Sequence, residues 1–238
     1  MYYASLSFVD EWVGKFMTKF DDLGYKSSSL ILFLSDHGDS LGDHHLWRKG
    51  FPTEQVATIP MFMRWPVTMN SVVSLERGST MNNLVELRDV FPTFADFAGI
   101  NVTGLDGSSL LGLVKNTSTT WRTYLDLELA TCNFNYTMNW NALTDGTMKY
   151  VYYQYTGEEQ LFNITADPYE LNDLSTTDTT TLEYWRDFLV QVFEDEGRTG
   201  IWVRDESLTT EKVCWMMDYT PNYPCWIDAV YTDGCSTT

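Results

Sequence analysis

Residues 29–45, SLILFLSDHGDSLGDHH, decide how the fold of this chain is interpreted. The run from Ser29 to Ser35 is apolar without polar alternation, which is typical of a strand buried on both faces of a parallel sheet. Apolar side chains recur at three- and four-residue spacing over residues 2–23, which predicts an amphipathic helix just before this strand. A helix followed by such a strand is half of a βαβ unit, so we expect an α/β sheet with helices on both faces.

Polar side chains that suit a metal site follow this strand directly. Asp36 and His37 come at its carboxyl end, where open α/β sheets bind ligands, and Gly38 lets both side chains turn toward one point. An Asp oxygen and a His nitrogen suit a divalent cation such as Ca²⁺, Mg²⁺, Mn²⁺ or Zn²⁺. Lys49 would place a positive charge against an anionic group. The plainer alternatives are a polar turn for the Asp-His pair and a solvated charge for Lys49.

The rest of the chain divides into two kinds of pattern. Residues 58–65 predict a second strand, and residues 82–99 predict a helix that starts or kinks near Asp89, because Pro92 falls inside it. After a loop-rich connection over residues 101–120, four short β-prone runs follow, with a hairpin signal at Asp145-Gly146. A closing helix is predicted over residues 182–193.

These patterns predict three regions. Residues 1–118 are expected to form part of an α/β domain. Residues 119–199 are expected to form a small antiparallel sheet with one helix, and residues 200–238 a tail that contains cysteines.

The charge balance excludes several classes of partner. The chain has 33 acidic and 15 basic side chains, a formal net charge of -18. Nucleic acids and anionic membrane surfaces are bound by an excess of Lys and Arg, so neither is expected as a partner. No stretch approaches the 18 or so consecutive apolar residues of a membrane span, so none is expected.

Cysteines and glycosylation triplets favour a secretory or lysosomal protein. The even count of four cysteines fits two disulfides in three possible pairings, the alternative being free thiols: Cys132, Cys214, Cys225 and Cys235. Four Asn-x-Ser/Thr triplets predict a glycoprotein; they begin at Asn101, Asn116, Asn135 and Asn163. The first residues do not read as a signal peptide, so we expect the natural chain to begin upstream of Met1.

Several motifs taken together resemble the sulfatase family of the alkaline-phosphatase-like superfamily. Residues 32–66, LFLSDHGDSLGDHHLWRKGFPTEQVATIPMFMRWP, resemble its metal-site region. Residues 84–93, LVELRDVFPT, resemble its D-x-x-P-T helix, and Lys149-Tyr150 with residues 159–172 resembles its C-terminal strand and turn. The resemblance implies a partial alkaline-phosphatase-like α/β sheet with flanking helices, followed by a small antiparallel β-sheet plus helix subdomain.

The resemblance also implies roles for particular residues. Asp36 and His37 match two metal ligands of the family, and Lys49 matches the lysine that contacts the transferred sulfate. His44 falls in the loop beside the site, where a supporting or substrate-facing role is expected. The metal is expected to be calcium, with Mg²⁺, Mn²⁺ and Zn²⁺ as alternatives. The nucleophile of such enzymes is a formylglycine made from a C-x-P-x-R or S-x-P-x-R segment.

The chain departs from the family pattern, and three hypotheses follow. It contains no C-x-P-x-R or S-x-P-x-R segment, and it lacks the early Asp-Asp ligand pair. The first hypothesis is the C-terminal half of a sulfatase that cleaves small or glycan sulfate esters, inactive until a missing N-terminal half or partner chain completes it. The second is a phosphonate or phosphate mono- or diester hydrolase of the same superfamily. The third is a non-catalytic, truncated binding module.

Overall fold

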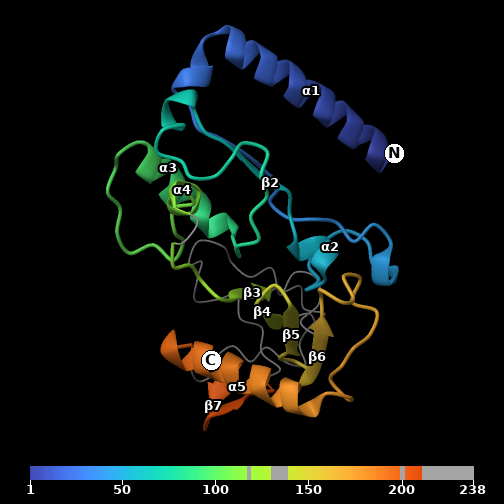
Figure 1. The fold of residues 1–238 in the computed structure, drawn as a ribbon. Coiled ribbons are helices and arrows are strands. Elements are labelled where there is room, and N and C mark those ends of the chain that lie inside the picture. The colour runs from blue at the N-terminus through green and yellow to red at the C-terminus, as the bar shows by residue number, and fades with distance from the viewer. Residues whose placement is uncertain (117–118, 130–138, 199–201, 211–238) are drawn as a thin grey trace, which may run out of the picture. The chain divides into compact units, whose positions relative to one another are not determined.

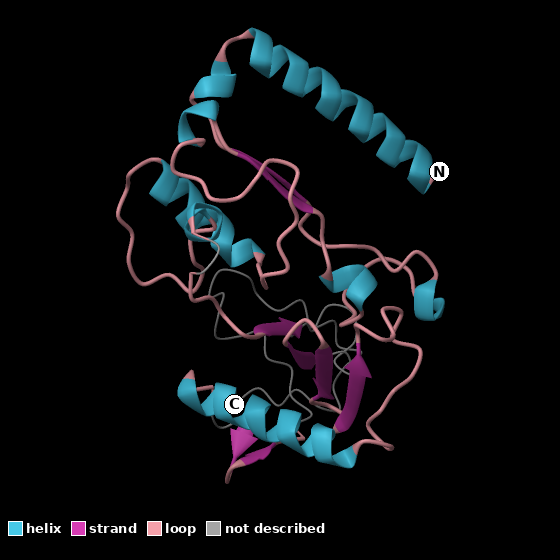
Figure 2. Ribbon diagram, viewed as in Figure 1, coloured by secondary structure: helices cyan, strands magenta, loops and turns pink. Residues whose placement is uncertain are grey.

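The chain folds into two compact units that interleave along the sequence. The computed structural model describes residues 1–116, 119–129, 139–198 and 202–210 (Figures 1 and 2). The first unit holds Met1–Ser35 and Pro60–Trp121, and the second holds Asp36–Ile59 and Arg122–Thr238. We call residues 36–59 the site loop. By its contacts it belongs with the C-terminal sheet, although strands of the first unit lie before and after it in the sequence.

Some of the sequence predictions lie outside the described residues. This holds for all four cysteines and their disulfides, for the triplet at Asn135, and for residues 211–238 of the predicted tail. Among the described residues, no helix combines the length and the apolar character needed to cross a bilayer.

The first unit begins with the predicted amphipathic helix. Helix α1 spans Tyr2–Asp22, and Gly24 follows it with φ of 84°, the left-handed conformation that lets a chain leave a helix sharply. A short 3₁₀ turn over Tyr25–Ser27 leads toward the first strand. No residue of α1 is buried against the described part of the chain. The helix therefore keeps its apolar stripe exposed within this unit.

Strands β1 and β2 form a two-stranded antiparallel ribbon. Strand β1 spans Ile31–Leu34 and β2 spans Met61–Arg64, so both predicted strands are confirmed. The sequence pattern predicts a parallel neighbour for β1. This prediction is wrong for the described residues, where β1 pairs with β2 in the antiparallel sense. The connection over residues 35–60 is long enough for a parallel crossover, but it contains only a 3₁₀ turn, Asp43–His45, and the four-residue helix α2, Glu54–Ala57, in place of a crossover helix. Phe33 and Phe62 remain 40% and 64% exposed, so the ribbon is not covered on both faces within this unit.

The D-x-x-P-T segment has a structural role, because its buried Asp89 holds a neighbouring loop in place by hydrogen bonds. Helix α3 spans Val90–Phe97 after a 3₁₀ turn over Leu87–Asp89, which confirms the predicted helix start. Pro92 lies in the first turn of α3, where its missing N–H leaves no helical bond unmade. The fully buried Asp89 carboxylate accepts N–H bonds from Glu86 at 2.9 Å and Ser108 at 2.8 Å. These bonds hold the following loop against the start of the helix.

A short helix occurs where only a loop was predicted. Helix α4 spans Leu111–Lys115 and buries Leu111, Leu113 and Val114. The hydroxyl of the fully buried Thr93 holds the start of this helix, because it accepts a hydrogen bond from the N–H of Leu110 at 2.9 Å. Another 3₁₀ turn spans Val67–Met69.

The second unit is built on a four-stranded antiparallel sheet, as predicted. The strands follow chain order across the sheet: β3, Leu125–Leu129; β4, Trp140–Thr144; β5, Met148–Tyr153; and β6, Glu158–Asn163. The predicted hairpin at Asp145-Gly146 joins β4 to β5, with Gly146 at φ of 83°. The Asp145 carboxylate accepts the N–H groups of Thr147 and Met148 at 2.8 and 2.7 Å, which explains the strength of this turn signal.

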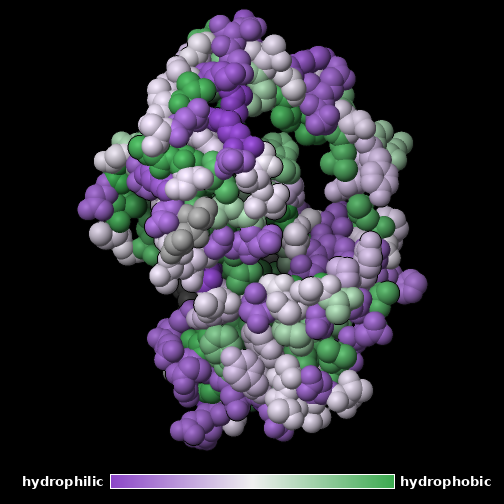
Figure 3. All heavy atoms as spheres, in the orientation of Figure 1, coloured by the Kyte–Doolittle hydropathy of each residue, from purple (hydrophilic) through white to green (hydrophobic). Residues whose placement is uncertain are grey.

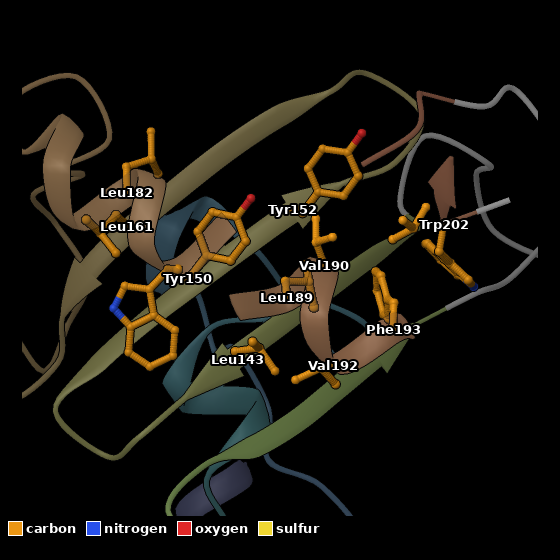
Figure 4. Close-up of a cluster of buried hydrophobic side chains, with 12 residues drawn as sticks. Leu143, Tyr150, Tyr152, Leu161, Leu182, Leu189, Val190, Val192, Phe193 and Trp202 are labelled. Atoms are coloured by element: carbon orange, nitrogen blue, oxygen red, sulfur yellow. The ribbon is translucent and has the colours of Figure 1, made fainter. Parts of the chain in front are cut away.

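Helix α5 covers one face of this sheet. It spans Thr179–Asp195, and the Asp178 side chain caps it by accepting the N–H of Thr181. Figure 4 shows side chains of α5 packed against the sheet, and Trp202 lies at the edge of the same cluster. Trp202 precedes a small hairpin of β7, Val203–Arg204, and β8, Ser207–Leu208. Fully buried members of this core include Leu143, Tyr150, Leu161, Leu189 and Phe193.

Alternation along β5 directs polar groups toward the site loop. Successive strand residues point to opposite faces, so Tyr150 and Tyr152 join the core under α5. Lys149, Val151 and Tyr153 point to the other face, where Lys149 contacts the site loop. One face of the sheet therefore forms a hydrophobic core, and the other supports the loop that carries the predicted chemistry.

Candidate functional site

Backbone hydrogen bonds close the site loop on itself. The N–H of Gly38 donates to Val56 O, that of Ser40 to Arg48 O, and that of Gly42 to Leu46 O, each at 2.8 Å. These bonds pair the two arms of the loop without forming a regular strand. The loop therefore has a defined shape that side-chain contacts alone would not provide.

The same loop stores backbone strain. Leu41, His44, His45 and Arg48 have φ of 49°, 51°, 60° and 71°, a region that costs a non-glycine residue about 1 kcal/mol or more. Such conformations persist only where the surrounding structure determines them, and they are concentrated at functional sites. The strain marks this loop as a candidate site independently of its residue types.

Gly38 is required by a close approach of two backbone segments. A Cβ added at this position would lie 1.9 Å from the carbonyl oxygen of Gln55. Gly38 thus brings the start of the loop against helix α2. The sequence pattern predicts that Gly38 is needed for an unusual φ, but Gly38 is not among the glycines with positive φ, so the structural reason for this glycine is space.

The structure brings Asp36, His37 and Lys49 together after β1. Nδ1 of His37 lies 2.7 Å from the carbonyl oxygen of Gly38, so Nδ1 carries the proton that makes this bond. In the neutral ring Nε2 then presents its lone pair, and Nζ of Lys49 lies 2.8 Å from it. A carboxylate oxygen of Asp36 lies 3.5 Å from the same nitrogen. Two of the predicted site residues, Asp36 and Lys49, thus lie beside Nε2 of a third, His37.

The Asp36 carboxylate is held in its ionised form. Desolvation is the largest single influence and favours the neutral acid, but the electrostatic interaction with His37 when its ring is protonated, the backbone N–H groups of Asp36 and His37, and the charge of Lys49 together lower the pKa below its usual value. One of these N–H bonds joins His37 N to Oδ1 of Asp36 at 3.0 Å. The side chain itself is 81% exposed. An exposed, ionised carboxylate beside an imidazole lone pair can accept a cation.

These donors fit part of a divalent-cation site. The bond from Nδ1 of His37 to a backbone carbonyl is the outer-shell contact that usually orients a metal-bound imidazole. However, the described residues contain no group of three or more His, Cys, Asp or Glu side chains that could hold a metal ion. Asp36 and His37 therefore fit two ligand positions, and further ligands are needed to hold a cation well.

His44, the fourth predicted site residue, makes a different contact. Its Nε2 lies 2.9 Å from the carbonyl oxygen of Tyr169, in the turn that follows β6. This bond ties the tip of the site loop to the C-terminal turn. The structure thus places His44 between the loop and the turn.

Sequence reasoning missed a buried ion cluster behind the loop, formed by Glu54, Lys149 and Glu170. Nζ of Lys149 lies 3.0 Å from a Glu54 oxygen and forms an ion pair with Glu170. The lysine side chain is 0% exposed and that of Glu170 is 2% exposed. A lysine in an alternating strand is expected to face water, so no sequence signal marked this one as buried.

Comparisons with known proteins give these residues a family context. Residues 1–100 match the family model for sulfatases. The chain is 33% identical over 203 residues to an arylsulfatase of Clostridium perfringens, covering 83% of this chain and 41% of that protein. It is 33% identical over 195 residues to a choline-sulfatase of Rhizobium meliloti, covering 78% of this chain and 36% of that protein. The chain thus spans about two fifths of the length of these curated relatives.

Solved structures share the fold. A putative sulfatase from Bacteroides fragilis superposes with a TM-score of 0.70 at 20% identity, over 82% of this chain and 42% of that one. The phosphonate monoester hydrolase of Agrobacterium radiobacter superposes with a TM-score of 0.66 at 21% identity, over 79% of this chain and 39% of that one. The predicted α/β fold, matching part of an alkaline-phosphatase-like domain, is confirmed.

Proposed function

Because the chain belongs to the sulfatase family, we propose that it carries the C-terminal portion of a site that hydrolyses sulfate esters. The observation that carries this proposal is the contact between His37 and Lys49, 2.8 Å apart in a strained loop after β1. A cation-binding nitrogen and an anion-binding ammonium meet there, which suits a sulfate group bound beside a metal ion. The substrate class is a small or glycan sulfate ester, and the likeness to a choline-sulfatase supports the small ester.

Each predicted residue has a task in this proposal. Asp36 and His37 would hold a divalent cation, with calcium the first choice and magnesium, manganese or zinc as alternatives. Sulfatases generally use such a metal, which stabilises charge on substrate oxygens. Lys49 would bind the sulfate group, and His44 would support the loop or face the substrate. The remaining ligands and the formylglycine nucleophile would come from the three fifths of the relatives' length that this chain does not span.

The proposal also includes a partner for the apolar surface of the first unit. A groove of about 490 Å³ lies between α1 and the β1–β2 ribbon. Figure 3 shows hydrophobic atoms beside a hollow along α1. Its occupant would be the N-terminal portion of a sulfatase domain, as part of a longer chain or as a second chain, because the relatives extend well beyond the matched length. The residues that line the groove are mostly apolar: Leu6, Val9, Val13, Met17, Ile31, Phe33, Phe62 and Met63.

Domain limits and location complete the proposal. Residues 1–118 would be the end of the catalytic domain, residues 119–199 its C-terminal subdomain, and residues 200–238 a tail. The protein would be a glycoprotein that is secreted or lysosomal. Asn101 and Asn116 are exposed and open to glycosylation, whereas Asn163 is half-buried.

The test completes the chain and measures sulfate release. The 238 residues would replace the matched part of the Clostridium arylsulfatase, so that the relative supplies the missing segments. We expect hydrolysis of 4-nitrophenyl sulfate, and we expect Asp36→Ala and Lys49→Ala each to abolish turnover while the protein stays folded. Lys115→Ala, at an exposed lysine of the first unit, is the matched control and should keep full activity.

Four outcomes would contradict parts of the proposal. Wild-type rates in Asp36→Ala or Lys49→Ala would reject the site. Faster cleavage of a phosphonate monoester than of the sulfate ester would favour the alternative hydrolase, for which likeness to a phosphonate monoester hydrolase offers fold-level support. Activity of the isolated chain that Asp36→Ala removes would reject the need for a missing half. A folded but inactive completed protein would leave the binding module as the better proposal.

A further inference from the structure

The site loop is anchored to the C-terminal sheet by polar contacts. Lys149 reaches from β5 to the loop, where its ammonium group donates to the carbonyl oxygen of Pro52 at 2.6 Å and to Glu54 at 3.0 Å. Its third contact is the ion pair with Glu170. Two of the three donors of this ammonium group therefore make hydrogen bonds, and the contact with Glu170 is electrostatic. Lys149 thus joins the site loop to Glu170, although it lies 95 residues after Glu54 and 21 residues before Glu170 in the sequence.

Glu170 completes the connection from the opposite side. One of its carboxylate oxygens accepts the backbone N–H of Glu54 at 2.7 Å. The residue is itself held in a left-handed conformation, with φ of 53°. The turn that carries it is fixed by Asp167, which accepts both the backbone N–H of Asn172 at 2.8 Å and its side-chain amide at 3.0 Å. Glu170 is therefore aimed at the loop by a rigid turn.

The loop is not held on the sheet by close packing alone. A cavity of about 190 Å³ lies between the loop and the sheet, so their surfaces do not interlock across the whole interface. A further polar contact lies at the end of the loop, where the Trp140 indole N–H donates to Gly50 O at 3.0 Å. Gly50 directly follows Lys49. The polar contacts thus act on the part of the loop that sets where Lys49 lies.

We propose that Lys149, Glu54 and Glu170 are positioning residues that fix the loop segment carrying Lys49 beside His37. We call these three residues the anchor cluster. It makes the C-terminal sheet part of the scaffold of the site, although none of its members touches His37 or Lys49 in the contacts described above. The inference rests on the proposed function only for its catalytic consequence, because the geometry of the loop can be measured in the chain itself.

The first experiment follows the imidazole of His37 in the 238-residue chain. Nitrogen-15 NMR of the three histidines, assigned by single substitutions, reports which ring nitrogen carries the proton. In the wild-type chain we expect His37 to be protonated at Nδ1 and hydrogen-bonded at Nε2. In Lys149→Met and Glu170→Gln we expect the Nε2 signal to shift toward that of a free imidazole, while methyl signals of the core under α5 stay in place.

A matched control separates positioning from general stability. Arg186 forms a bidentate ion pair with Glu159 in the same unit, with N–O distances of 2.7 and 2.6 Å, and neither residue touches the site loop in the described contacts. Glu159→Gln should lower the stability of the unit and leave the His37 signals unchanged. Unchanged His37 signals in both anchor variants would overturn the proposal. So would loss of the core methyl signals in both, because the cluster would then be a general requirement of the core.

The second experiment measures the catalytic consequence in the completed protein. A misplacement of about 1 Å caused far from the reacting groups can lower the rate about 100-fold, and we expect a fall in kcat/KM of up to that size for Lys149→Met. Glu170→Gln should lose less, because the amide oxygen can still accept the N–H of Glu54. If the completed wild-type protein lacks sulfatase activity but the His37 signals respond as described, the proposed function fails and the positioning inference stands.

Discussion

Nε2 of His37 lies 2.8 Å from Nζ of Lys49, while Nδ1 of the same ring is bound to the carbonyl oxygen of Gly38. The lone pair that could bind a metal ion is therefore in contact with an ammonium group. Two cations cannot share this lone pair, so a metal ion at Nε2 requires Lys49 to release it. Release would leave the Lys49 donors available for an anion, which links the two halves of the predicted site.

This competition predicts that removing Lys49 strengthens metal binding by the isolated chain. Lys49→Met removes both the competing donor and its repulsion, which is about 1 kcal/mol or more for charges 4 Å apart in water. We expect the affinity for Mn²⁺ to rise at least about fivefold, from the weak binding expected of two ligands. Electron paramagnetic resonance of free Mn²⁺ measures this directly. Lys115→Met should not change the affinity, and an equal affinity in Lys49→Met and wild type would argue against the competition.

Substitution of Gly38 should loosen the start of the site loop. In Gly38→Ala the new methyl group would meet the carbonyl oxygen of Gln55 at 1.9 Å, so the two segments must separate. We expect a loss of about 1–3 kcal/mol in the free energy of unfolding, measured with urea. Gly14→Ala is the matched control, because its methyl group meets no atom within 4 Å in the middle of α1. That change should stabilise the helix, and equal losses from both substitutions would count against the close approach.

The hydrogen bonds accepted by the buried Asp89 carboxylate should be essential for the stability of the first unit. Asp89→Ala leaves the N–H groups of Glu86 and Ser108 without this acceptor in a buried site, which costs about 1–3 kcal/mol for each unsatisfied group. Thr93→Val keeps the shape but loses the bonds to Asp89 O and from Leu110 N. We expect a smaller but measurable loss for Thr93→Val in urea unfolding. A loss below about 0.5 kcal/mol in Asp89→Ala, the size typical of surface changes, would contradict this role.

Tyr153 should give the chain a step in stability at alkaline pH. Burial, together with the nearby charges of Glu158, Glu170 and Asp173, raises the pKa of Tyr153 to about 12. The raised pKa means that its contribution to stability is complete below pH 10.0, the ordinary value, and is lost as the pH rises from there to about 12. The difference in absorbance at 295 nm between the wild type and Tyr153→Phe should therefore titrate near pH 12. A midpoint near pH 10 would show that the phenol is solvated.

Local patterns predicted most of the elements. The spacing of apolar residues predicted α1, and the Asp145-Gly146 turn predicted the β4–β5 hairpin, because both signals lie within one element or one turn. The apolar run of β1 predicted a strand but not the direction of its neighbour. A continuous apolar run is typical of strands in parallel sheets, but a strand of a sandwich core gives the same pattern, so the run does not fix the direction of the neighbouring strand. Helix α4 was missed because its single buried turn is flanked by Ser and Thr residues.

The candidate site was predictable only where its residues are close in sequence. Asp36, His37 and Lys49 lie within one loop, and the structure brings them together. The anchor cluster joins residues 95 and 116 positions apart, and no single-sequence pattern reports such pairs. Lysine is almost never fully buried unless it is paired, and here two hydrogen bonds and the ion pair with Glu170 allow Lys149 to be buried.

The interleaved course of the chain restricts how members of this family can be recombined. The chain passes between its two units at Ser35/Asp36, Ile59/Pro60 and Trp121/Arg122. A chimera with one crossover near Trp121 would join the loop of one parent to the sheet of the other, so that Glu54 and Lys149 would come from different parents. A chimera that exchanges residues 36–59 together with the segment after Trp121 keeps both sides of this contact from one parent. Gene shuffling should therefore recover functional hybrids mainly of the second kind.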